Sequence, residues 1–211
     1  MRDGDLLKLT QWLSPAFPVG GFAYSHGLEA AVSAGDVTDA GTLKRWLSDV
    51  LWLGAGRADA VLLMATQRGG DLAELTDLAA ALAASRERWE ETLAQGRAFG
   101  DTVEALTGRR QPEAPLAIAV GHAARMLDLD PVRVAGLYLH AFASNLVSGA
   151  VRFVPLGQTE GQGVLAALHP LIEQVAAEAS ETEPDAISNA AVGADLAAMA
   201  HETLEVRIFK T

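Results

Sequence analysis

The stretch DPVRVAGLYLHAFASNLVSGAV, residues 130–151, indicates the class of fold. An aspartate followed by a proline is typical of a helix start, because the aspartate side chain caps the first turn and proline lacks the N–H that would stay unpaired there. Apolar residues then recur every three or four positions, and the middle of the stretch is nearly uncharged. We therefore predict a long helix at the centre of a helical bundle. Its apolar positions are Val134, Leu137, Tyr138, Ala141, Phe142, Leu146 and Val147.

Helical periodicity also dominates the chain before this stretch. Thr38 or Asp39 precedes apolar residues at the spacing i, i+3, i+4, i+7 and i+8, which predicts a capped helix of about four turns. Asp71 and Glu74 have the spacing of a capping box, so we expect another helix to begin there. The two apolar faces are formed by Leu43, Trp46, Leu47, Val50 and Leu51, and by Leu72, Leu75, Leu78, Ala79 and Leu82.

Residues 85–107 have the pattern of a longer, two-sided helix. Its apolar residues step by three or four positions, and charged residues take much of the remaining surface. The next segment, Arg109 to Pro115, contains two prolines, which favour a surface connection over a domain boundary. The charged residues expected at the surface of the helix are Arg86, Glu87, Glu90, Glu91, Arg97 and Glu104.

The C-terminal part is predicted to hold two more helices and a tail. Thr159 and Gln162 repeat the capping-box spacing, which predicts a helix from about Glu160 to residue 180 that Pro170 kinks or restarts. A last helix is expected near 185–202, and residues 203–211 alternate like an extended strand. The sequence thus predicts an all-α fold, a single domain over residues 1–211 with eight or so helices and an extended C-terminal tail, 203–211.

Composition limits the classes of function. Half of the 211 residues are apolar and a fifth are charged, which is typical of a globular domain. The formal net charge of −11 disfavours nucleic acid and anionic membranes as partners. The absence of cysteine excludes disulfides and thiolate metal sites. The sequence shows no signal peptide and no apolar run of the ~18 residues that a membrane span needs, so a cytoplasmic protein is expected.

The five histidines give no metal motif. They are His26, His122, His140, His169 and His201, and none has a second histidine at i+4, where two imidazoles would share a helical face. His201 and Glu202 resemble the start of a zinc-protease helix, but Glu205 stands where the second histidine is required. We therefore expect neither a tight metal site nor a cofactor.

Other catalytic patterns also fail. The glycine-rich segment 157–163 lacks the Lys-Ser/Thr pair of a nucleotide-binding loop, so a tight turn before a helix is expected. Ser25 is not part of a nucleophile elbow, because Ala23 replaces the first glycine of that motif. Acidic residues such as Glu90 and Glu91 are interpreted as solvated helix faces. The sequence therefore predicts a protein that is not an enzyme.

Three segments nonetheless resemble signatures of UreF-type urease accessory proteins. They are LSPAFPVGGFAYSHGLE at residues 13–29, VPLGQTEGQ at 154–162 and HETLEVRIFKT at 201–211. They follow the order and the approximate spacing of the family. The resemblance extends more loosely to residues 85–96 and to the helix before Arg152.

The resemblance implies an all-α, often dimeric, non-enzymatic scaffold. Such proteins bind a UreD-type accessory protein, also called UreH, and through that complex the nickel-carrying GTPase UreG. The assembly docks on apo-urease and loads nickel while the GTPase hydrolyses GTP. A scaffold without a nucleotide site can couple the two events if it prefers one nucleotide state of its partner.

Two groups of residues are predicted to bind partners. In the tail these are His201, Glu202, Arg207 and Phe209, because an extended apolar tail suits docking on another chain. The alternative is that the tail packs on its own domain. In the loop and the helix start after it they are Arg152, Gln158, Thr159, Glu160 and Gln162, expected to face the GTPase, with a purely structural turn as the alternative.

Two other classes of function remain open from the sequence. A generic helical interaction domain unrelated to urease explains the helices and the acidity, but leaves the three signature segments unexplained. A small helical metal-dependent hydrolase requires histidines and carboxylates that converge in a pocket, whereas the sequence offers scattered ones.

Overall fold

A computed structural model describes residues 3–211, and the regular secondary structure in that range is entirely helical. The predicted all-α class is therefore confirmed. The ten α-helices are α1 (Asp3–Trp12), α2 (Leu28–Ala34), α3 (Ala40–Trp52), α4 (Ala55–Gln67), α5 (Leu72–Leu82), α6 (Arg86–Thr107), α7 (Leu116–Ala124), α8 (Pro131–Ala150), α9 (Gln158–Ser180) and α10 (Val192–His201). Two short 3₁₀ helices, η1 (Gly21–Ala23) and η2 (Pro184–Ala186), complete the set.

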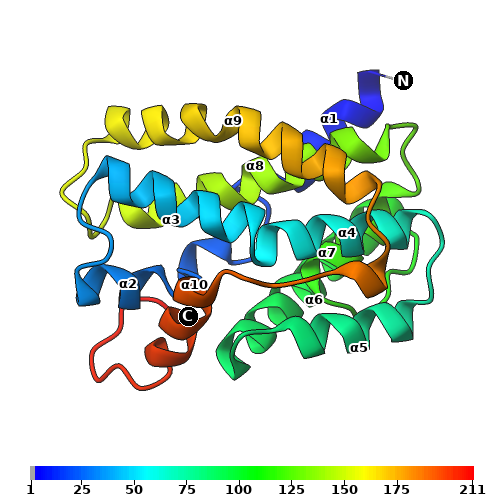
Figure 1. Cartoon of the computed structure of the whole chain (residues 1–211). Helices are drawn as coiled ribbons and strands as arrows, with labels where there is room; N and C mark the ends of the chain where they lie inside the picture. The colour runs from blue at the N-terminus through cyan, green and yellow to red at the C-terminus, as the bar shows by residue number, and fades with distance from the viewer. Residues whose placement is uncertain (1–2) are drawn as a thin grey trace.

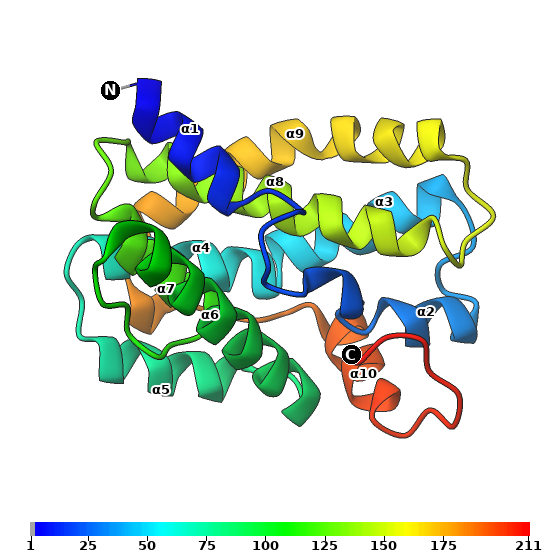
Figure 2. The ribbon, with the colours of Figure 1, turned by 180° about the vertical axis from the view of Figure 1, so that it is seen from behind.

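The helices form one bundle around α8. In Figure 1, α3 and α4 follow one another along the middle, and α8 and α9 run beside them. Figure 2 shows α5, α6 and α7 gathered at one end and α2, α10 and the C-terminal tail at the other. The predicted core residues Val134, Tyr138, Leu146 and Val147 are buried. One continuous cluster of buried residues reaches from α1 to α9.

Helix starts follow the predicted capping chemistry. The Asp130 side chain accepts from the backbone N–H of Val132 at 2.8 Å, with Pro131 in the first turn. Asp39 and Thr42 form a reciprocal capping box at α3, and Asp71 accepts from two N–H groups of α5. These contacts satisfy donors that a first helical turn leaves unpaired, so α3, α5 and α8 begin where the sequence predicts.

Two details of α9 correct the sequence interpretation. The helix begins at Gln158, because the Glu160 carboxylate accepts from the N–H of Gly157 at 2.9 Å; the pair Thr159 and Gln162 is not the cap. Helix α9 also continues through Pro170, so the helix does not restart there.

The C-terminal region departs further from the prediction. Helix α10 begins at Val192 and not near 185, because residues 187–191 cross the bundle as an extended connection. A hydrogen bond holds this connection in place: the Ala190 N–H donates to the carbonyl of Leu53 at 2.8 Å. Residues 203–211 form turns and bends, so the strand-like conformation suggested by their alternation is wrong. Figure 2 shows this tail looping out from α10 and returning toward η1 and α2.

Candidate partner-docking surface

The tail is held against α2 by a buried carboxylate. Glu29 accepts from the backbone N–H of Ile208 at 2.9 Å through Oε1, and from that of Phe209 at 3.0 Å through Oε2. Its side chain is buried, so these charge-assisted bonds are sheltered from water. Gly27 lets α10 approach closely, because a Cβ there would lie 2.7 Å from the nitrogen of Ala198.

His201 joins this carboxylate to α6. It is completely buried, and its Nδ1 lies 2.7 Å from Glu87 Oε2 while its Nε2 lies 3.2 Å from Glu29 Oε2. A neutral imidazole has one N–H and donates to one of these carboxylates only, whereas an imidazolium donates to both. The histidine that opens the third signature segment therefore ties three helices together.

The other predicted tail residues lie around the same point. Arg207 forms an ion pair with Glu87, and Glu202 Oε1 accepts from the backbone N–H of Glu87 at 3.1 Å. That N–H belongs to the first turn of α6, where the helix dipole favours a carboxylate. His201, Glu202 and Arg207 thus converge on the start of α6.

A second buried acid fixes the last residue. Thr211 Oγ1 donates to Glu91 Oε2 at 2.7 Å, and Thr211 O accepts from the N–H of Ser25 at 2.9 Å. Glu91 also pairs with Arg88 and is only 6% exposed. The expectation that Glu91 faces solvent is therefore wrong, because the tail and Arg88 cover it.

Phe209 links the tail to the loop before α9. Its ring is buried and lies 4.9 Å from that of Phe153, measured between centroids. The Arg152 guanidinium lies over the same ring, 5.8 Å from its centroid, which is the geometry of a cation–π contact. One member of each predicted group, Arg152 and Phe209, is thus brought into contact.

The rest of the loop group lies at the surface. Gln158, Thr159, Glu160 and Gln162 are exposed in the first turns of α9. Glu160 is occupied with capping Gly157, as described above. The structure therefore places this group next to the tail but does not bring its members to a single point.

The tail and α10 each expose large apolar side chains. Val206 and Ile208 are 84% and 73% exposed, although their neighbours in the chain are anchored. On α10, Val192, Leu196 and Met199 are exposed at i, i+4 and i+7 and therefore share one face. We call these five residues the apolar face. Exposed apolar residues gathered on one element are typical of an interaction site.

Beside the tail anchor runs a groove of about 330 Å³. One wall is the first signature segment, including Pro15 and Phe22, and the other is α8. Asn145 of α8 donates to the carbonyl of Gly21 at 2.9 Å and holds the two walls together. Arg152 lies in the lining of the groove, so the groove adjoins the predicted loop group.

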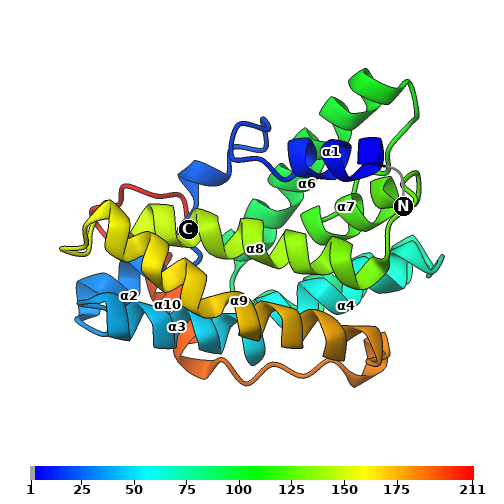
Figure 3. The ribbon, with the colours of Figure 1, turned by 90° about the horizontal axis from the view of Figure 1, so that it is seen from above.

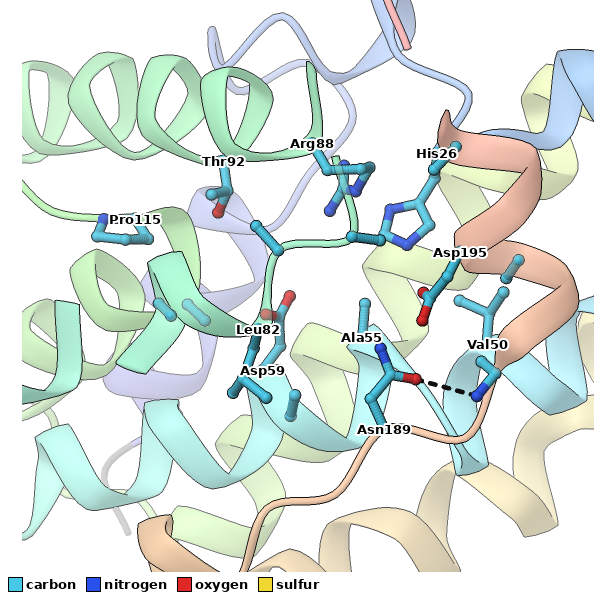
Figure 4. Close-up of a pocket in the computed structure, with 18 of the residues that line it drawn as sticks. His26, Val50, Ala55, Asp59, Leu82, Arg88, Thr92, Pro115, Asn189 and Asp195 are labelled. Carbon is cyan, nitrogen blue, oxygen red and sulfur yellow. Dashed lines mark hydrogen bonds between the residues drawn. The ribbon is translucent and has the colours of Figure 1, made fainter. Parts of the chain in front are cut away.

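A smaller cavity of about 60 Å³ lies between α4, α6 and α10 (Figure 4). His26 faces it with a positive φ of 59°, and its Nδ1 is buried without a partner among the described residues. Burial and the neighbouring Arg88 hold the pKa of His26 well below its usual value. The volume corresponds to roughly two water molecules.

Asp59 is the perturbed acid of this cavity. Burial raises its pKa to about 6, against a hydrogen bond from Tyr138 Oη at 2.7 Å that lowers it. The phenol pKa of Tyr138 is raised well above its usual value by burial and by the charge of Asp59. The pair connects α4 to α8 in the interior of the bundle.

Sequence reasoning missed the acids that hold the tail. Glu29, Glu87 and Glu91 each contact residues of the tail or of the end of α10, but none of them was predicted as a site residue. Glu29 closes the first signature segment, and Glu87 and Glu91 fall within the looser resemblance over residues 85–96. Helical spacing alone does not distinguish a buried carboxylate from a solvated one. Only the resemblance of these segments to the family indicated that the three acids matter.

Residues 3–211 hold neither a metal-binding cluster nor a membrane-spanning helix. No group of three or more His, Cys, Asp or Glu side chains lies close enough to hold a metal ion. No helix there is both long and apolar enough to cross a membrane.

Comparisons with known proteins identify the family. A family model described as UreF matches residues 37–169. A protein of Cereibacter sphaeroides strain KD131 is 64% identical over 206 residues, covering 98% of each chain, and one of Jannaschia sp. is 54% identical over 211 residues, covering 100% of this chain and 96% of its own. A protein of Roseobacter denitrificans is 47% identical over 213 aligned positions, again covering 100% and 96%. Each of the three is named urease accessory protein UreF. The chain belongs to the UreF family.

Proposed function

We propose that this chain is a urease maturation factor that works as a non-enzymatic scaffold. In this proposal it binds a UreD-type accessory protein and a UreG-type GTPase in the cytoplasm, and the complex docks on apo-urease, with nickel as the cargo. Its relatives carry the name of urease accessory proteins, which supports the role in maturation. Family membership also argues against a helical domain unrelated to urease.

The observation that carries the proposal is the anchored tail with its apolar face. Glu29 and Glu91 use their carboxylates to fix the tail from inside, and Val206 and Ile208 remain exposed. A preorganised segment loses little conformational entropy on binding, so its apolar side chains contribute more of their burial to affinity. We assign this face to the UreD-type partner.

The loop group is assigned to the GTPase. Gln158, Thr159 and Gln162 are exposed, and Arg152 contacts Phe209 of the tail. Binding of one partner at the tail therefore affects Arg152 through its contact with Phe209, and Arg152 belongs to the loop group. Such a shared contact is a route by which binding of the UreD-type protein favours one state of the loop, and by linkage binding of the GTPase.

The experiment is complementation of a urease operon that lacks its UreF gene, with nickel supplied. Four chains are compared: wild type, V206D/I208D, L196D/M199D, and the control Leu106→Asp, which replaces another exposed leucine (57% exposed) at the far end of α6. Urease activity and co-purification with the UreD-type partner are both measured. We expect activity and co-purification from the wild type and from the control, and loss of both from the two double variants.

The readouts separate the parts of the proposal. Soluble wild-type chain that fails to restore activity and fails to bind the UreD-type protein from its own source rejects the role in maturation. Normal activity of both double variants rejects the apolar face as the docking surface while the role in maturation stands. Because the substituted residues are exposed, all four chains are expected to fold alike.

A further inference from the structure

Two histidines that are far apart in the sequence meet between α8 and α9. The rings of His140 and His169 have centroids 5.4 Å apart and planes inclined by 45°. Each residue lies about three turns from the loop that joins the two helices. The helices run antiparallel side by side, as Figure 3 shows, so equal distances from the loop place the two residues opposite one another. The absence of a sequence motif thus did not reveal that these two rings lie together.

The separation of the rings fits a shared metal ion. Metal–nitrogen bonds to histidine are about 2.0–2.1 Å, which places a ring centre roughly 3.2 Å from the ion. At a tetrahedral angle two such rings have centres roughly 5.2 Å apart. The observed centroid separation of 5.4 Å is within a few tenths of an ångström of that distance, so the spacing of the two rings is compatible with one shared ion.

The surroundings favour a cation. His169 is exposed and His140 is partly exposed, so an ion reaches them from solvent. Glu173 lies one helical turn after His169 and adds a negative charge to the same face, on a chain whose net charge is −11.

We propose that His140 and His169 bind one divalent transition-metal ion of the class that prefers imidazole, Zn²⁺, Ni²⁺ or Cu²⁺. With two ligands from the protein, the remaining positions belong to water, so the site is open and exchanges its ion readily. This distinguishes it from a structural zinc site, which is closed by four protein ligands. The site is separate from the tail and the loop group and does not depend on the proposed function.

The test is calorimetric titration of Zn²⁺ into the full chain without a histidine tag. We compare the wild type with His140→Ala, His169→Ala, the double variant, and His122→Ala, a control that removes a partly exposed histidine of α7. We expect one equivalent of Zn²⁺ to bind the wild type and the control alike. Each single variant loses one of two ligands and is expected to bind at least about tenfold more weakly.

NMR of the imidazole nitrogens supplies a second readout. Zn²⁺ is expected to shift one nitrogen resonance of His140 and one of His169, and to leave His122 in place. The proposal is overturned if the double variant binds Zn²⁺ as tightly as the wild type, or if the wild type binds none. Because His169 is exposed, its replacement is expected to leave the metal-free melting temperature unchanged, so loss of binding in that variant reports on the site.

Discussion

The imidazole Nδ1 of His201 lies 2.7 Å from the Oε2 atom of Glu87, and this contact joins the end of α10 to the beginning of α6. The other ring nitrogen faces Glu29 of α2. Three segments that are distant in the sequence are thus held by a single side chain that solvent does not reach. The position of the tail, and with it the apolar face, depends on this buried contact.

Replacing His201 by alanine should destabilise the fold strongly. The change leaves Glu29 and Glu87 facing a cavity without the donor between them, and losing a buried hydrogen-bond donor together with opening a cavity costs about 3 kcal/mol or more. Urea denaturation measures the loss in free energy of unfolding. The control is Glu205→Ala in the exposed part of the tail, for which we expect a change within about 0.5 kcal/mol. Equal stability of the two variants would contradict the bridging role.

Replacing Glu29 by glutamine should loosen the tail without unfolding the bundle. Glutamine keeps one acceptor oxygen and places an NH₂ group where the second carboxylate oxygen accepts, so at least one of the two backbone donors, Ile208 or Phe209, loses its partner. Amide hydrogen exchange of these two residues is expected to accelerate at least about tenfold, which corresponds to about 1.4 kcal/mol of local opening. Amides in the middle of α8 serve as the internal control and should keep their protection.

The helices of this fold were predictable because their signals are local. Asp39, Asp71 and Asp130 cap helices at the positions that the sequence indicates, since capping needs only a side chain and the next two or three N–H groups. The start of α9 was misplaced because two acceptable caps compete within three residues, and the Glu160 carboxylate outcompetes the Thr159 hydroxyl. The start of α10 was misplaced because residues 187–191 bond to Leu53, which no local pattern reveals.

The candidate site was less predictable than the fold. Arg152 and Phe209 were chosen for separate reasons, and only the tertiary structure shows that they touch. The acids that hold the tail are spaced like surface residues on their helices. They are covered only by the C-terminal residues, which lie more than a hundred positions away in the sequence, so no local pattern reveals their burial. The His140–His169 pair was missed for the same reason: its spacing of 29 positions carries meaning only once the hairpin of α8 and α9 is known.

Replacing Gly27 by alanine should cost more stability than the same change at Gly35. Both glycines flank α2 with positive φ, 78° and 83°, so each alanine is strained by roughly 1 kcal/mol. At Gly27 the new Cβ would also lie 2.7 Å from the backbone nitrogen of Ala198, whereas nothing lies within 4 Å at Gly35. Thermal melting of the two variants compares them directly. We expect Gly27→Ala to melt several degrees below Gly35→Ala, and equal melting would show that α10 does not rest on α2.

Replacing Asp59 by asparagine should stabilise the protein, and more so as the pH rises. The folded-state pKa of Asp59 is raised from 3.8 to about 6, so the folded protein binds a proton more tightly than the unfolded chain does. Stability contributed by this group is therefore present below pH 4 and is lost as the pH rises through 6. Asparagine carries no charge to desolvate and still accepts from Tyr138 through its amide oxygen.

The measurement is the free energy of unfolding of wild type and Asp59→Asn at pH 5 and at pH 8. The pKa shift of Asp59 corresponds to a total loss of about 3 kcal/mol in the free energy of unfolding of the wild type, and about half of this loss develops between pH 5 and pH 8. The difference in free energy of unfolding between Asp59→Asn and the wild type should therefore grow by about 1.5 kcal/mol over this range. The control is Asp39→Asn, because hydrogen bonds from Thr42 lower the pKa of Asp39 below its usual value and its titration is complete by pH 5. The difference between that variant and the wild type should therefore stay flat from pH 5 to pH 8. A flat difference for Asp59→Asn as well would mean that the carboxylate is not desolvated in the folded protein.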